Sequence, residues 1–108
     1  MMYRQQAGSV YRSVGSNDVK RLRKVMVMYE AALNACVTRD IARFEEALDA
    51  LEATLDFAAW PELAMSLSAL YHRCRQEGGA GLFREAGATL ATLRKAWLSG
   101  GHFAQKAG

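Results

Sequence analysis

The stretch that decides the fold is residues 18–37, DVKRLRKVMVMYEAALNACV. Its apolar residues recur three, four and seven positions apart, as the buried face of an α-helix requires. They are Leu22, Val25, Met26, Tyr29, Leu33, Cys36 and Val37. This spacing predicts a long helix over residues 18–37. Ser16, Asn17 or Asp18 can cap its start, because their side chains accept hydrogen bonds from free backbone N–H groups.

Three more apolar residues, Val27, Met28 and Ala31, lie outside that face of the first helix. They have two interpretations: the helix is buried on more than one side, or it carries a groove for another chain. We favour the core interpretation, because large apolar residues are most often buried.

A second helix is predicted downstream of residue 40. Its apolar residues are separated by three or four positions, which makes a clean helical face; they are Ile41, Phe44, Leu48, Leu51 and Leu55. Asp40 or Thr38 supplies the N-cap, and the helix is expected to end near Phe57.

The third and fourth helices are marked by proline and glycine. Pro61, the only proline, suits the first turn of a helix, where its missing N–H costs nothing. Gly78 and Gly79 are expected to end this third helix with a left-handed cap. The fourth begins around Gly81 or Leu82 and stops at residues 100–101.

These elements predict an all-α fold, an antiparallel up-down four-helix bundle with a short N-terminal helix or extended strap. The 108 residues suit a single domain, since 51% are hydrophobic and 23% charged. We expect a strap over residues 1–16, the bundle over 17–99 and a flexible tail over 100–108.

The net charge of +3 is the sum of opposing segments. Residues 1–24 contain six cationic residues and one acidic residue, whereas residues 38–62 contain seven acidic and two cationic residues. The structural interpretation is that these are solvated helix faces. The functional one is nucleic-acid binding by the basic residues 20–24, and the acidic segment disfavours it because phosphates would be repelled.

Several other function classes have no support in the sequence. No apolar run approaches the roughly 20 residues of a membrane span, and the N-terminus does not resemble a secretory signal, so a cytoplasmic protein is expected. Cys36 and Cys74, like His72 and His102, lack metal-ligand spacing, and the thiols are expected to be free and buried. No catalytic pair, metal or cofactor is predicted.

The N-terminal third carries two motifs of a known family. Tyr3 and Tyr11, followed by Val14, are similar to the start of that family's chains, and residues 27–33 (VMYEAAL) are similar to its Met-Leu-Tyr-Asp-Gly-Ala-Leu. One departure is the basic pair at residues 20–21, which stands where the family begins its first long helix with proline.

Further motifs follow in the same order. Residues 39–41 (RDI) are similar to the family's Gly-Asp-Ile, and residues 62–71 (ELAMSLSALY) to its Glu-Ile-Ala, Leu and Leu-Tyr. Residues 93–97 (LRKAW) are similar to its Leu-Arg-x-Ala-Trp. Over nearly its whole length the chain therefore resembles the flagellar secretion chaperones of the FliS family.

This resemblance implies a cytoplasmic export chaperone. Such a protein binds the C-terminal segment of flagellin, prevents its premature polymerisation and delivers it to the flagellar type III export apparatus. A component of the export gate is a further partner, and the free protein is expected to be a monomer or weak homodimer. The implied partner-binding residues are Tyr3, Tyr11, Val14, Tyr29, Leu33, Leu67, Leu70 and Tyr71. Those on the long helices have a plain core role as their alternative, because a small bundle needs its large apolar side chains inside.

Overall fold

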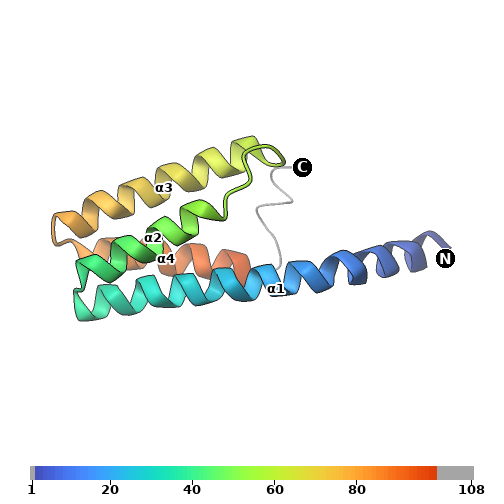
Figure 1. Cartoon of the computed structure of the whole chain (residues 1–108), viewed down its shortest axis with the longest axis horizontal. Coiled ribbons are helices and arrows are strands. Elements are labelled where there is room, and N and C mark those ends of the chain that lie inside the picture. The colour runs from blue at the N-terminus through green and yellow to red at the C-terminus, as the bar shows by residue number, and fades with distance from the viewer. Residues whose placement is uncertain (1, 100–108) are drawn as a thin grey trace.

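The computed structural model describes residues 2–99, with side chains from Val19 onward, and within this range its regular structure is entirely helical (Figure 1). The elements are α1 (Met2–Thr38), α2 (Ile41–Ala53), α3 (Pro61–Gly79) and α4 (Phe83–Leu98). The predicted all-α class with four helices is confirmed. None of these helices is long and apolar enough to cross a membrane, as far as the described residues go.

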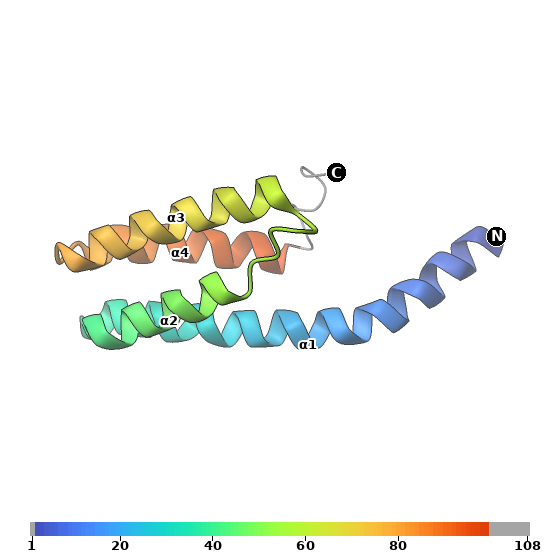
Figure 2. The ribbon, with the colours of Figure 1, turned by 45° about the horizontal axis from the view of Figure 1, so that its top comes forward.

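The first helix is longer than predicted. α1 begins at Met2, so residues 2–16 continue it and do not form a separate strap or short helix. The physical reason is that nothing in residues 2–38 removes a backbone N–H, since the only proline is Pro61, and glycines weaken a helix without ending it. The early part of α1 projects past the other three helices (Figures 1 and 2). The predicted tail over residues 100–108 lies outside the described residues.

The starts of α2 and α3 follow the predicted capping chemistry. Asp40 has an extended backbone, and its Oδ1 accepts a hydrogen bond from the backbone N–H of Arg43 at 3.2 Å. Pro61 is the first residue of α3, as predicted. α2 ends at Ala53, four residues before the expected Phe57.

Two similar turns end α1 and α3. After α3, the N–H of Leu82 bonds to the Glu77 carbonyl at 2.7 Å and that of Gly81 to the Gly78 carbonyl at 2.9 Å, the hydrogen-bond pattern of a Schellman motif. The left-handed residue is Gly81, with φ 81°, and not Gly78 or Gly79 as predicted.

Arg39 holds the equivalent position after α1. The Asp40 N–H bonds to the Ala35 carbonyl at 2.9 Å, the Arg39 N–H bonds to the Cys36 carbonyl at 3.3 Å, and Arg39 has φ 57°. This region of backbone space favours glycine. α1 therefore ends in the same motif as α3, with an arginine in the place that glycine usually takes.

The helices form two layers, α1 beside α2 and α3 beside α4 (Figure 2). α1 packs against α2 and α4, and α3 packs against the same two helices. The core between them is built from one face of each helix. Its largest fully buried side chains are Tyr29, Tyr71, Phe44, Leu48, Leu51, Leu90 and Cys74.

Candidate functional site

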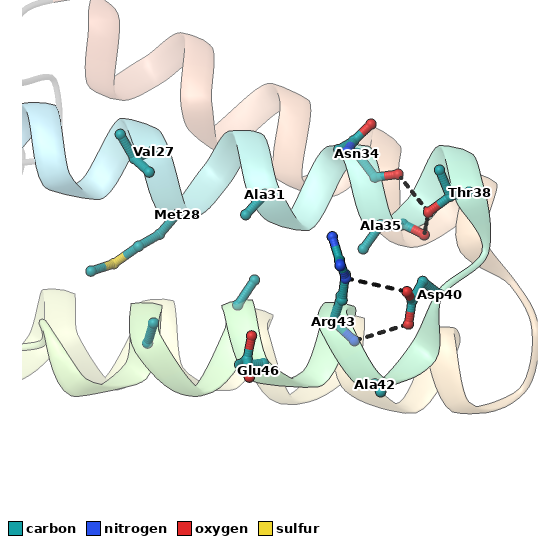
Figure 3. A pocket seen from close by; sticks show the side chains of 12 residues that line it. Val27, Met28, Ala31, Asn34, Ala35, Thr38, Asp40, Ala42, Arg43 and Glu46 are labelled. Atoms are coloured by element: carbon teal, nitrogen blue, oxygen red, sulfur yellow. Dashed lines mark hydrogen bonds and ion pairs between the residues drawn. The ribbon is translucent and has the colours of Figure 1, made fainter.

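A groove of about 730 Å³ runs between α1 and α2 (Figure 3). Small side chains line much of it: Ala31 and Ala35 on α1, and Ala42, Ala47 and Ala50 on α2. Ala35 and Ala47 are buried and the other three are exposed or half-buried, so the groove is open to solvent. Because methyl groups fill little of the space between the two helices, the surface here is hollow and apolar.

Two larger apolar side chains, Val27 and Met28, line the end of the groove that is nearer the N-terminal part of α1. Val27 is 61% exposed, and the half-buried Met28 reaches toward the gap between the helices (Figure 3). An exposed valine gains free energy when a partner covers it, because apolar area leaves water. A thioether can repack against side chains of different shapes.

The other end of the groove is polar. The carboxylate of Asp40 caps α2 and also forms an ion pair with Arg43, 3.5 Å from Nε to Oδ2. The Thr38 hydroxyl donates back to the Asn34 carbonyl at 3.1 Å. Glu46 is exposed on the α2 wall, and no ion pair links it to another described residue. These polar side chains can form hydrogen bonds with polar groups of a ligand, while the alanines contact its apolar side chains.

Three of the residues predicted to bind a partner lie in the core instead of the groove. Tyr29, Leu67 and Tyr71 are at most 2% exposed. The two tyrosine hydroxyls are hydrogen-bonded at 2.6 Å, and the Trp97 indole N–H donates to the Tyr29 hydroxyl at 3.1 Å. Burial raises the pKa of both tyrosines above its usual value. In this conformation these side chains join α1, α3 and α4, and a partner cannot reach them.

The remaining predicted residues are placed differently. Leu33 and Leu70 are half-buried and pack against the core. Tyr3, Tyr11 and Val14 belong to the projecting part of α1, and their side chains lie outside the described part of the structure. The structure therefore does not bring the eight predicted residues together into one surface.

The two free thiols are buried, as the sequence predicted. Burial, together with the charge of Glu77, raises the pKa of Cys74 to about 12, and burial also raises the pKa of Cys36. At neutral pH both are therefore protonated, the unreactive form of cysteine. Among the described residues, no three His, Cys, Asp or Glu side chains lie close enough together to hold a metal ion.

Sequence reasoning found only part of the groove. Val27, Met28 and Ala31 stand out in the sequence as apolar residues outside the core face. The favoured core interpretation is wrong for Val27 and Ala31, which are exposed. The α2 wall was missed. Ala42 and Ala50 are eight positions apart and so lie on one face of α2, but an alanine stripe indicates a groove only once the neighbouring helix is known.

The chain matches no protein-family model, and no characterised protein or solved structure is significantly similar to it. The ligand of the groove must therefore be inferred from the residues of this chain.

Proposed function

We propose that this protein is a cytoplasmic export chaperone that binds the C-terminal segment of flagellin, prevents its premature polymerisation and delivers it to the flagellar type III export apparatus. The observation that carries the proposal is the groove between α1 and α2, which is apolar along its alanine-lined part. A segment that becomes helical on binding can lay one apolar face into such a groove, with anchors at i, i+3, i+4 and i+7.

A helix-in-groove complex suits a carrier. Ordering of the segment on the chaperone costs conformational entropy, which lowers the affinity per unit of buried area. The segment can therefore be released later. The methyl floor of the groove, with Ala31 at its centre, leaves room for larger side chains of the ligand (Figure 3).

The backbone at Arg39 supports the resemblance to the FliS family. The motif that residues 39–41 resemble has glycine at this position, and the backbone here has φ 57°, which favours glycine. Similarly, Ala31 stands where the family motif has glycine, and it is a small residue in the groove. The backbone geometry at residue 39 thus suits the glycine that the motif has there, and at residue 31 the shared property is small size.

We infer further that the helices follow an antiparallel up-down order. Residue pairs between neighbouring helices support it, because a later residue on one helix meets an earlier residue on the other. The pairs are Asp49–Arg75 and Glu52–Ser68 between α2 and α3, and Glu30–Arg94 and Cys36–Gly87 between α1 and α4. In this order α1 and α2 form an antiparallel hairpin, and the groove lies between its two helices.

Calorimetry with the C-terminal peptide of the flagellin from the same organism tests the proposal. We expect a one-to-one complex and a negative heat-capacity change, because apolar surface is buried. Ala31→Gln should weaken binding at least about tenfold, since the longer side chain fills the groove and about 1.4 kcal/mol corresponds to tenfold in affinity.

Ala69→Gln is the matched control, because Ala69 is an exposed alanine on α3, away from the groove. It should leave the affinity unchanged, and circular dichroism should show both variants folded. Absence of binding at tens of micromolar, or equal affinities for the Ala31 and Ala69 variants, would contradict the proposal.

A further inference from the structure

The face of α1 that lines the groove continues past the end of α2. An α-helix turns 100° per residue, so positions 20 and 38 lie on one line along the helix, five turns apart. Val27 and Ala31 lie within 20° of this line, and both line the groove. Beyond the part of α1 that faces α2, the same line reaches Lys20, with Lys24 40° to one side of it and Arg23 60° to the other.

These three cations are exposed and no ion pair or hydrogen bond links their side chains to another described residue. Some other cations of the bundle do have such partners: Arg75 pairs with Asp49 at 2.6 Å and Arg94 with Glu30 at 3.1 Å. Lys20, Arg23 and Lys24, which we call the basic track, thus place three positive charges on or beside the line that leads into the groove.

We propose that the occupant of the groove is an amphipathic helix of a partner protein that is acidic at one end, so that its carboxylates lie over the basic track. This inference rests on the proposed function, because it assumes that a helix docks between α1 and α2, and it adds the chemistry of that helix. From position 20 to position 38 the docking line is about 27 Å long, which matches a partner helix of about 18 residues.

An acidic protein helix suits this surface better than nucleic acid does. The groove offers an apolar floor and an exposed carboxylate, Glu46, on its far wall. A phosphate backbone gains nothing from the floor and is repelled by that carboxylate and by the acidic segment over residues 38–62. A helix with separate apolar and acidic parts complements both halves of the surface.

Two designed 18-residue peptides test the inference. Both carry leucines at i, i+3, i+4 and i+7; one has three glutamates near one end, and the other has glutamines at the same places. We expect the glutamate peptide to bind about tenfold more tightly at low salt, because three exposed ion pairs form. The difference should largely vanish at about 0.5 M NaCl, where exposed charges are screened.

The triple variant Lys20→Gln, Arg23→Gln, Lys24→Gln should bind both peptides equally, with the affinity that the wild type shows for the glutamine peptide. Arg21→Gln is the matched control, because Arg21 is an exposed cation on the same turn but 100° away from Lys20. It should preserve most of the preference for the glutamate peptide.

Equal affinity of the wild type for the two peptides, or no binding of either, would overturn the inference. So would an Arg21→Gln effect as large as that of the triple variant. Tighter binding to duplex DNA than to the glutamate peptide, or a salt-sensitive dimer by ultracentrifugation, would instead assign the basic track to nucleic acid or to a second copy. If the glutamate peptide binds as expected and the flagellin peptide does not, the proposed function fails and the inferred partner chemistry stands.

Discussion

Gly78 lies on α3 directly against the aromatic ring of Phe44 on α2, and it is buried. A Cβ atom at this position would lie 2.7 Å from Phe44 Cδ2 and closer still to Cε2, less than any ordinary van der Waals contact. The ring itself is held by Phe83, whose centroid lies 5.6 Å away in an edge-to-face arrangement. The absence of a side chain at residue 78 therefore sets how closely α2 and α3 approach.

Gly78→Ala should destabilise the protein by about 1–3 kcal/mol, because the extra methyl group forces the Phe44 ring out of its place. Gly79→Ala is the control, since a Cβ there meets nothing within 4 Å. It should be neutral or stabilise the protein by up to about 1 kcal/mol through helix propensity. Urea unfolding followed by circular dichroism measures both, and equal effects of the two substitutions would contradict the packing argument.

At the scale of the elements, one side chain joins the turns that end α1 and α3. The Arg39 guanidinium donates a hydrogen bond to the Gly81 carbonyl at 3.2 Å and lies 5.3 Å from the centroid of the Phe83 ring. These contacts offset the cost of a left-handed backbone at a residue with a Cβ atom. Through these two contacts, Arg39 links the α1–α2 turn to the α3–α4 turn at one end of the bundle.

Arg39→Ala should lower the free energy of unfolding by about 1–2 kcal/mol, because the hydrogen bond and the cation–π contact are lost while the backbone strain remains. Arg39→Gly loses the same contacts but relieves about 1 kcal/mol of strain. The glycine variant should thus be the more stable of the two in urea unfolding. The opposite order would show that the left-handed backbone carries no strain.

Helix ends were predictable from sequence where a local cap decides them. Asp40 and Pro61 fixed the starts of α2 and α3 because their own side chains act within one turn. The start of α1 was not predictable in this way, since Ser16, Asn17 and Asp18 are compatible with a helix interior as well as a cap.

The groove could be predicted only in part, because it belongs to two helices at once. Val27 and Ala31 stand out on α1 as residues off the core face, but their exposure depends on how far α2 extends alongside them. Likewise, Tyr29 and Tyr71 are of a residue type common at binding surfaces, and the hydrogen bond that joins them in the core becomes apparent only when α1, α3 and α4 are assembled around that core.

At the scale of the whole molecule, the core carries four groups that must stay protonated: Tyr29, Tyr71, Cys36 and Cys74. Burial raises the pKa of each of them above its ordinary value, which is 10.0 for the tyrosines and 9.0 for the thiols. The unfolded chain therefore releases protons at a lower pH than the folded chain does. Their contribution to stability is complete below pH 9 and is lost as the pH rises above it.

The free energy of unfolding should thus be constant between pH 7 and 8 and fall progressively above about pH 9, since the pKa of folded Cys74 is about 12 against 9.0 when unfolded. Urea titrations at a series of pH values measure this. In the variant Cys74→Ala, which is less stable at neutral pH, the fall should be shallower, and it should still start near pH 9 because the buried thiol of Cys36 remains. An unchanged pH profile in this variant would contradict the assignment to Cys74.

The projecting part of α1 also governs how the molecule moves in water. The protein measures 54 × 23 × 19 Å and has a radius of gyration of 15.5 Å, against about 13 Å for a compact domain of 108 residues. A rod of this kind meets more friction than a sphere of equal mass and tumbles faster about its long axis than across it. Early elution from a size-exclusion column is therefore the expected behaviour of a single copy, and light scattering is the measurement that gives its mass.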